Sequence, residues 1–197
     1  MVANSTREIQ MNAAVKFVPH YTVDDYALWK GDWELWEGIA VAMSPSPFGV
    51  HQGVVTRLSR LIGVDIEAVQ CDAEVIIELD WIISSVTVVR PDIMVVCGPP
   101  PERHLEQTPT LVAEVLSDST RQNDLNFKRQ LYRRLGVGIY LIVDPASQSV
   151  EVDRRQSDGS YLAEIAAVDL AMQLCDDCHI HIPTAKVFHR ATSGNAN

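Results

Sequence analysis

Leu111-Val112-Ala113-Glu114-Val115-Leu116 is an apolar run with one carboxylate near its middle. Nearly continuous apolar runs are expected for strands that are covered on both faces of a sheet. A glutamate in such a strand is costly unless it is paired or bound to a cation. For this residue alone, a salt bridge or exposure at a sheet edge is the plain alternative. The run predicts a central strand and makes Glu114 a candidate site residue.

A second carboxylate lies upstream, in Arg90-Pro91-Asp92, at the edge of another apolar stretch. We predict one strand over residues 86–96, and Asp92 within it meets the same cost of burial. If the two strands pair, the two carboxylates come together, and carboxylate oxygens are the ligands that Mg²⁺ prefers. The pair of acids therefore favours a metal site over two separate salt bridges.

The rest of the chain predicts a single α/β domain with a mixed sheet flanked by helices. Thr22 and Asp25 are typical of a helix N-cap, and residues 33–43 alternate at period two around a turn at Glu37-Gly38. Helices are expected over about 51–62 and 125–135, and further strands over 73–79, 138–143, 150–154 and 161–167. We place the domain at residues 21–190, after a loose lead-in (1–20) and before a frayed tail (191–197), with Pro45 and Pro47 as a break.

Three residues of the predicted helix over 125–135 share one stripe. Asp124, Lys128 and Tyr132 recur every four residues, and leucines lie beside them, so the stripe is predicted to face inward. Lys128 would then approach the two carboxylates, where a positive group suits a site in which a phosphate develops negative charge. The alternative is an exposed i,i+4 ion pair with Asp124, worth only about 0.3–0.5 kcal/mol.

The charge distribution gives two interpretations. The formal net charge is −10, which opposes non-specific attraction to a polyanion. Residues 121–134, however, hold five cations against one acid, a local balance of +4. This segment is either a solvated helix face or a surface that guides a nucleic-acid backbone. Any nucleic-acid binding is expected to be weak, salt-dependent and concentrated here.

The cysteines and the hydropathy add expectations about the compartment. Cys71 and Cys97 stand alone in apolar stretches and are expected to be buried, reduced thiols. Cys175 and Cys178 form one C-x-x-C followed by two histidines, and zinc or redox chemistry is only a minor alternative because a second pair is not evident. No apolar run approaches the roughly 18–20 residues that cross a bilayer, and the first ten residues lack the apolar region of a secretory signal. We expect a cytoplasmic protein with no membrane partner.

Several segments match, in order, the pattern of a known family. They are Trp33-Glu34-Leu35-Trp36-Glu37-Gly38, Met43-Ser44-Pro45, His51-Gln52, Arg90-Pro91-Asp92, the Glu114 run with Ser117, Ser119-Thr120-Arg121, Asp124, Lys128, Tyr132 and Tyr140-Leu141-Ile142-Val143-Asp144-Pro145. With this order and spacing the chain resembles the Uma-type family of restriction-endonuclease-like proteins, within the PD-(D/E)XK nuclease superfamily. The resemblance spans roughly residues 21–189.

The resemblance implies a restriction-endonuclease-like core and a Mg²⁺-dependent endonuclease that hydrolyses DNA, with Mn²⁺ as the alternative ion. It assigns the two acidic positions of the motif to Asp92 and Glu114, and adds the main-chain carbonyl of Val115 as a third metal ligand. The lysine of the motif would stand two residues after the glutamate, where this chain has Leu116. Lys128 is the expected replacement, carried by the next helix.

The resemblance also implies one further acid or histidine from an element before the sheet, for which Glu34 is the first choice and His51 the second. Two other functions stay open. One is a catalytically weak nucleic-acid-binding or regulatory module that keeps the fold, which the acidic composition supports. The other is a hydrolase for a smaller phosphodiester, because a fold does not determine a substrate. A homodimer is expected only by analogy with enzymes that cut both strands of a duplex.

Overall fold

The structure is a computed structural model that describes residues 18–43 and 49–188. Its main element is a six-stranded sheet in the order β10-β9-β8-β7-β6-β3, in which only β7 and β8 are parallel. This confirms the mixed sheet of an α/β fold. The strands are β3 (Ala73–Ile77), β6 (Ile93–Cys97), β7 (Leu111–Val115), β8 (Ile139–Asp144), β9 (Ser149–Arg155) and β10 (Tyr161–Ile165).

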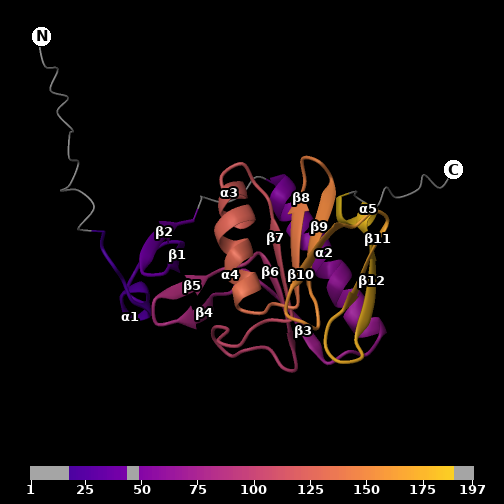
Figure 1. Cartoon of the computed structure of the whole chain (residues 1–197), viewed down its shortest axis with the longest axis horizontal. Helices are drawn as coiled ribbons and strands as arrows, with labels where there is room; N and C mark the ends of the chain where they lie inside the picture. The colour runs from indigo at the N-terminus through magenta and orange to yellow at the C-terminus, as the bar shows by residue number, and fades with distance from the viewer. Residues whose placement is uncertain (1–17, 44–48, 189–197) are drawn as a thin grey trace, which may run out of the picture.

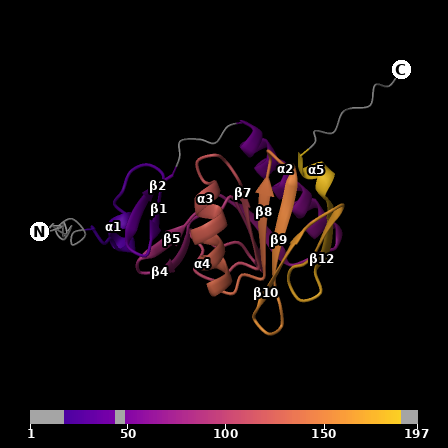
Figure 2. The ribbon, with the colours of Figure 1, turned by 45° about the horizontal axis from the view of Figure 1, so that its top comes forward.

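A separate four-stranded antiparallel sheet, in the order β2-β1-β5-β4, stands at one end of the molecule (Figure 2). Its strands are β1 (Trp33–Trp36), β2 (Ile39–Ala42), β4 (Trp81–Ser84) and β5 (Thr87–Val89). The predicted hairpin turn is confirmed, because Glu37 and Gly38 both adopt positive φ, 49° and 85°. A two-residue turn of this kind matches the twist of the strands that it joins.

The prediction of one strand over residues 86–96 is wrong, because β5 and β6 belong to different sheets. Arg90-Pro91-Asp92 forms the passage between them, and proline has no N–H to donate to a ladder. β4, which pairs with β5, was not predicted at all. The consequence for the site is that Asp92 stands where the chain leaves one sheet and enters the other.

Helices cover both faces of the six-stranded sheet (Figure 1). On one face, α2 (Gly49–Ala68) buries Val54, Leu58 and Ile62 against alternate residues of β6 and β7. On the other face, Leu131 and Tyr132 pack against the intervening residues of the same strands. These two side chains belong to a helical segment made of α3 (Arg121–Asn123), the π-helical turn η1 (Asp124–Lys128) and α4 (Arg129–Arg134).

Two helices of the N-terminal half can be compared with their predicted positions. The predicted N-cap is confirmed in α1 (Val23–Tyr26), where Thr22 and Asp25 form a capping box. The helix predicted over 51–62 is α2, which is longer than predicted at both ends, from Gly49 to Ala68. No helix of the described chain is long and apolar enough to span a membrane.

The C-terminal region forms a hairpin and a short helix that local patterns did not predict. β11 (Asp169–Gln173) pairs with β12 (His179–Pro183), and α5 (Thr184–Phe188) follows. These elements pack beside α2, as Figures 1 and 2 both show. Their core residues, such as Leu170 and Ile182, extend the apolar layer between α2 and the sheet.

Two disulfides tie this hairpin to the α2–β3 connection and to β6, so the expectation of reduced thiols is wrong. Cys71 pairs with Cys178 and Cys97 with Cys175, with Cα–Cα distances of 5.5 and 5.8 Å. Cys97 is also exposed rather than buried. The pairs are 107 and 78 residues apart, a separation that no local pattern reveals. Since all four cysteines lie in the described chain and none of them is free, the C-x-x-C has no thiol to offer to zinc.

Some predicted boundaries cannot be compared with the structure. The predicted tail, 191–197, lies outside the described residues, as do Pro45 and Pro47. Of the predicted lead-in, only residues 18–20 are described.

Candidate active site

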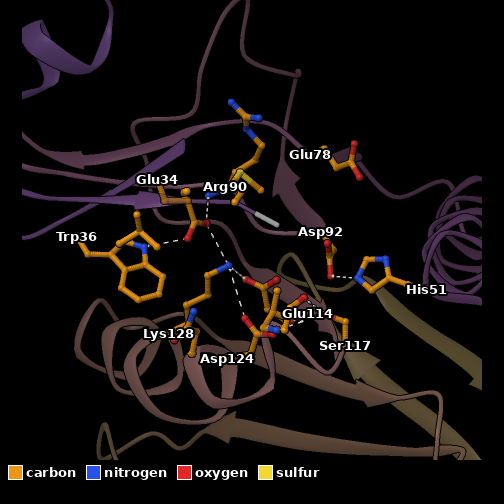
Figure 3. Close-up of a pocket in the computed structure, with 16 residues that line it drawn as sticks. Glu34, Trp36, His51, Glu78, Arg90, Asp92, Glu114, Ser117, Asp124 and Lys128 are labelled. Atoms are coloured by element: carbon orange, nitrogen blue, oxygen red, sulfur yellow. Dashed lines mark hydrogen bonds and ion pairs between the residues drawn. The ribbon is translucent and has the colours of Figure 1, made fainter. Parts of the chain in front are cut away.

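A pocket of about 140 Å³ lies where the β5–β6 passage, the end of β7, the start of α2 and η1 meet (Figure 3). Eight of the sixteen residues that line it are ionisable. All five side chains predicted for the site line it, together with three ionisable ones that were not predicted as site residues. The five are Glu34, His51, Asp92, Glu114 and Lys128, and the other three are Glu78, Arg90 and Asp124.

The pairing of β6 with β7 places Asp92 and Glu114 together. Ile93 is the Cα partner of Ala113, and the same antiparallel register, continued by one residue, sets Asp92 opposite Glu114. Glu114 points away from α2, because it alternates with Val115, which packs on the α2 face. The strand pairing expected from the sequence therefore brings both carboxylates to one end of the sheet.

Glu114 is almost completely buried, with 3% of its surface exposed. Its Oε1 accepts hydrogen bonds from Lys128 Nζ at 3.0 Å and from the hydroxyl of Tyr132 at 2.8 Å. Burial raises the pKa of Glu114 well above its usual value. The ammonium of Lys128 lowers this pKa, whereas the nearby carboxylates, Asp124 foremost, raise it. Glu114 is thus a carboxyl group whose ionisation depends on the cations around it.

Lys128 is buried and shared among three carboxylates. Its Nζ lies 3.0 Å from Glu114 Oε1, 3.1 Å from Glu34 Oε1 and 3.7 Å from Asp124 Oδ1. Burial lowers the pKa of Lys128, but these carboxylates outweigh it and hold the pKa well above the usual value. The i,i+4 pair with Asp124 does exist, yet it is buried. The amine points inward and meets Glu114 on β7, as the helical stripe predicted, and it also meets Glu34 on β1, which the stripe did not predict.

Asp92 and His51 form the opposite wall of the pocket. Asp92 Oδ2 accepts the main-chain N–H of Val115 at 2.7 Å and lies 3.3 Å from His51 Nε2. Burial lowers the pKa of His51, but the hydrogen bond and charge of Asp92, helped by Val115 and Asp124, raise it overall. Among the described residues, His51 Nδ1 is buried without a hydrogen-bond partner. The contact places His51 on α2 in reach of the sheet's carboxylate (Figure 3).

Glu34 joins the four-stranded sheet to this pocket. Its Oε1 accepts the main-chain N–H of Arg90 at 2.7 Å, and its Oε2 accepts the indole N–H of Trp36 at 2.9 Å. Arg90 in turn pairs with Asp80 at 2.7 Å. These bonds hold Glu34 in the orientation that meets Lys128.

Asp124 is the site residue that sequence reasoning missed. It was identified as a member of the helical stripe and of the family's pattern but was given no role in the site, and the inward stripe was the signal that could have found it. Only 2% of its surface is exposed, and within the described chain its Oδ1 has no hydrogen-bond partner. Burial raises the pKa of Asp124 to about 6, against the opposing effects of Lys128 and Thr120.

This raised pKa predicts a pH dependence of stability in metal-free protein. Because the folded carboxyl binds its proton more tightly than the unfolded one, its contribution favours folding at low pH. That contribution is lost as the pH rises from about 4 through about 6. Asp124→Asn should not show this loss. Relative to the original protein, its free energy of unfolding should rise by on the order of 2 kcal/mol between pH 4 and 7. Urea unfolding in EDTA at each pH measures this, and parallel pH profiles for the two proteins would contradict it.

The residues of the pocket fit a divalent cation by charge and by donor type. In the described chain, no group of three or more histidine, cysteine, aspartate or glutamate side chains is already arranged to hold a metal ion. However, five carboxylates share the pocket with the ammonium of Lys128 and the guanidinium of Arg90, and Asp124 Oδ1 is buried without a hydrogen bond. Hard cations such as Mg²⁺ bind oxygen donors of this kind. A cation would offset the carboxylate charge that Lys128 leaves unbalanced.

The basic segment over residues 121–134 is not a free cationic surface. Apart from the buried Lys128, its arginines are bound to acids of the same chain. The pairs are Arg121 with Asp144 at 2.9 Å, Arg129 and Arg133 with Asp153 at 2.6 and 2.7 Å, and Arg134 with Glu37 at 3.0 Å. Asp153 is completely buried, so two of these arginines anchor α4 to β9. The sequence could not reveal this neutralisation, because the acids come from strands and a turn that are remote from this helical segment in the sequence or have no fixed spacing to it.

A mixed sheet whose paired strands bring carboxylates to one pocket, with helices on both faces, defines a restriction-endonuclease-like α/β protein. The backbone is similar to the crystal structure of a putative nuclease belonging to DUF820 from Anabaena variabilis, with a TM-score of 0.69. That similarity covers 85% of this chain and 97% of the other, at 20% sequence identity, and so concerns the fold alone. No curated protein matches the chain.

The family is shown by the sequence. The model of the Uma2 family, described as "Putative restriction endonuclease", matches residues 23–176. The chain belongs to this family.

Proposed function

We propose that this protein is a divalent-metal-dependent endonuclease that hydrolyses phosphodiester bonds in DNA. The observation that carries the proposal is the meeting of Asp92, Glu114 and the Lys128 amine in one pocket. The family and the fold support the same class of activity. Mg²⁺ is the proposed ion, with Mn²⁺ as the alternative.

Asp92, Glu114 and the main-chain carbonyl of Val115 would hold the ion. When bound, it would offset negative charge on the phosphate and make water a better nucleophile. The N–H of Val115 already binds Asp92 Oδ2, so this carboxylate is oriented before any ligand arrives. Such preorganisation reduces the cost of assembling a site.

Lys128 would act on the substrate, and His51 on one of the carboxylates that would hold the ion. The high pKa of Lys128 keeps its amine cationic, so it can hold a phosphate oxygen as negative charge develops. Glu34 fixes the position of that amine from the neighbouring sheet. His51 positions Asp92 through its Nε2 contact.

Plasmid nicking tests this proposal. Asp92→Asn and Glu114→Gln should each reduce Mg²⁺-dependent nicking by at least about 100-fold, which corresponds to a loss of roughly 2.7 kcal/mol of transition-state stabilisation. Asp169→Asn, which removes an exposed carboxylate on β11, is the matched control and should leave nicking unchanged. Equal nicking by all four proteins would contradict the proposed site.

The second candidate is a nucleic-acid-binding module with little turnover. The net charge of −10 and the neutralised arginines on the α3–η1–α4 segment favour it. Mg²⁺ calorimetry and nicking, measured side by side, separate the two. Metal and DNA binding without cleavage of plasmid DNA or single-stranded RNA indicates the module. Cleavage of bis(p-nitrophenyl) phosphate but of no nucleic acid indicates a hydrolase for small phosphodiesters.

A further inference from the structure

A second concave surface lies beside the active-site pocket. It is a groove of about 1010 Å³ along α2, with β12 and the start of α5 as its other wall. We call it the α2–α5 groove. His51 lines the active-site pocket, and the next two residues of α2, Gln52 and Gly53, line the groove. The two surfaces therefore meet at the first turns of α2.

The α2–α5 groove carries the positive charge that the α3–η1–α4 segment lacks. Arg57, Arg60 and Lys186 line it, against the single acid Asp65. Asp65 is already engaged, because its Oδ2 accepts the main-chain N–H of His181 at 2.9 Å. Within residues 18–43 and 49–188, none of the three cations forms an ion pair. Their charges are available to a ligand, unlike those of Arg129 and Arg133.

The first of these cations is directed towards the active site. A Cβ at Gly53 would lie 3.1 Å from Arg57 Nη1, so the guanidinium folds back along α2 in the direction of His51. Glycine leaves room for this conformation. The Nε of Arg57 donates to the carbonyl of Val187 at 2.9 Å, which fixes the base of the side chain while its end faces the groove.

We propose that the α2–α5 groove binds the phosphate backbone of the DNA strand that enters the active site. This inference rests on the proposed function and adds the path of the substrate. The lined part of α2, from residue 52 to residue 65, is about 20 Å long at 1.5 Å per residue. Phosphates of one strand recur every 3.4 Å along a duplex, so about six fit beside it. Arg57 and Arg60 lie on this helix, and Lys186 faces them from α5.

The salt dependence of binding measures the proposed contacts. Each neutralised phosphate contributes about −0.9 to the slope of log K against log salt, so three cations contribute about −2.7. Between 50 and 200 mM salt this slope corresponds to an approximately 40-fold loss of affinity. If the groove binds the backbone, removing the three charges should remove this part of the salt dependence of the DNA affinity.

The experiment uses a fluorescein-labelled 20-base-pair duplex and anisotropy in EDTA, where cleavage does not interfere. The variant Arg57→Gln, Arg60→Gln, Lys186→Gln should bind at least 10-fold more weakly at 50 mM salt and show a slope shallower by about 2–3. The control Lys30→Gln, Arg103→Gln, Arg155→Gln removes the same charge from exposed positions elsewhere and should retain most of the affinity. Circular dichroism checks the fold of both. Arg57→Lys, which keeps the charge, should retain binding.

Three results would overturn the inference: unchanged affinity of the groove variant, an equal loss in the control variant, or equal competition by poly-L-glutamate for the groove. The last would indicate an acidic polypeptide rather than nucleic acid as the ligand. Failure of the proposed function is a different result. If DNA binding depends on the groove but the protein never nicks DNA with Mg²⁺, the groove proposal stands and the proposed nuclease activity fails. If the protein nicks DNA equally well with and without the three cations, the proposed nuclease activity stands and the groove proposal fails.

Discussion

Replacing Lys128 by methionine should lower the free energy of unfolding at pH 7 by about 3–5 kcal/mol and abolish Mg²⁺-dependent nicking. The loss of stability follows because the ammonium is the shared partner of Glu34, Glu114 and Asp124, all of which are buried. Removing one member of a buried ionic group leaves uncompensated charge, which costs far more than a lost surface pair. Urea unfolding measures the first effect and plasmid nicking the second.

Two comparisons separate this effect from a general loss of packing. The destabilisation should shrink towards pH 4, because the carboxyls whose pKa values are raised, Glu114 and Asp124, then take up protons. Lys30→Met, at an exposed position, should change stability by less than about 0.5 kcal/mol. A Lys128→Met protein as stable as the original at pH 7 would show that the buried amine does not compensate these carboxylates.

Breaking either disulfide should lower the free energy of unfolding by an amount similar to that expected for Lys128→Met. The loops that Cys71–Cys178 and Cys97–Cys175 close span 107 and 78 residues. Chain entropy assigns about 4–5 kcal/mol to either bridge alone. Because the shorter loop lies inside the longer one, the variant Cys71→Ser, Cys97→Ser should lose less free energy of unfolding than the two single variants lose in sum. Denaturant unfolding of the single and double variants, under non-reducing conditions, measures these losses.

Counting thiols tests the bridges directly. The unreduced protein, unfolded in guanidinium, should react with no equivalents of a thiol reagent, and four equivalents should react after reduction. Four reactive thiols without reduction would contradict both bridges. In the unreduced Cys97→Ser variant one thiol should react, and peptide mapping of the labelled residue should identify it as Cys175 if the pairing is the one in the structure.

The sequence by itself determined what depends on near neighbours. The turn at Glu37-Gly38, the capping box of Thr22 and Asp25 and the inward stripe of Lys128 follow from conformational preferences and spacing over a few residues. The apolar run around Glu114 predicted a central strand for a similar reason. Together with the carboxylate of Asp92, these signals predicted the α/β class and placed Asp92, Glu114 and Lys128 as candidates for one site. Glu34 and His51, which also line the pocket, were expected only from the resemblance to the family.

Only the tertiary structure decided how distant segments are combined. It divided residues 86–96 between two sheets, paired the cysteines across 107 and 78 residues, and bound the arginines of the α3–η1–α4 segment to acids of other strands. It also left Arg57, Arg60 and Lys186 of the α2–α5 groove without an ion-pair partner in the described chain. A charge, a thiol or a strand edge acquires its partner only when the chain folds, so its environment is set by groups that are remote in sequence. The local pattern cannot contain that information, because the free energy of an ion pair or a buried carboxyl depends on what surrounds it in space.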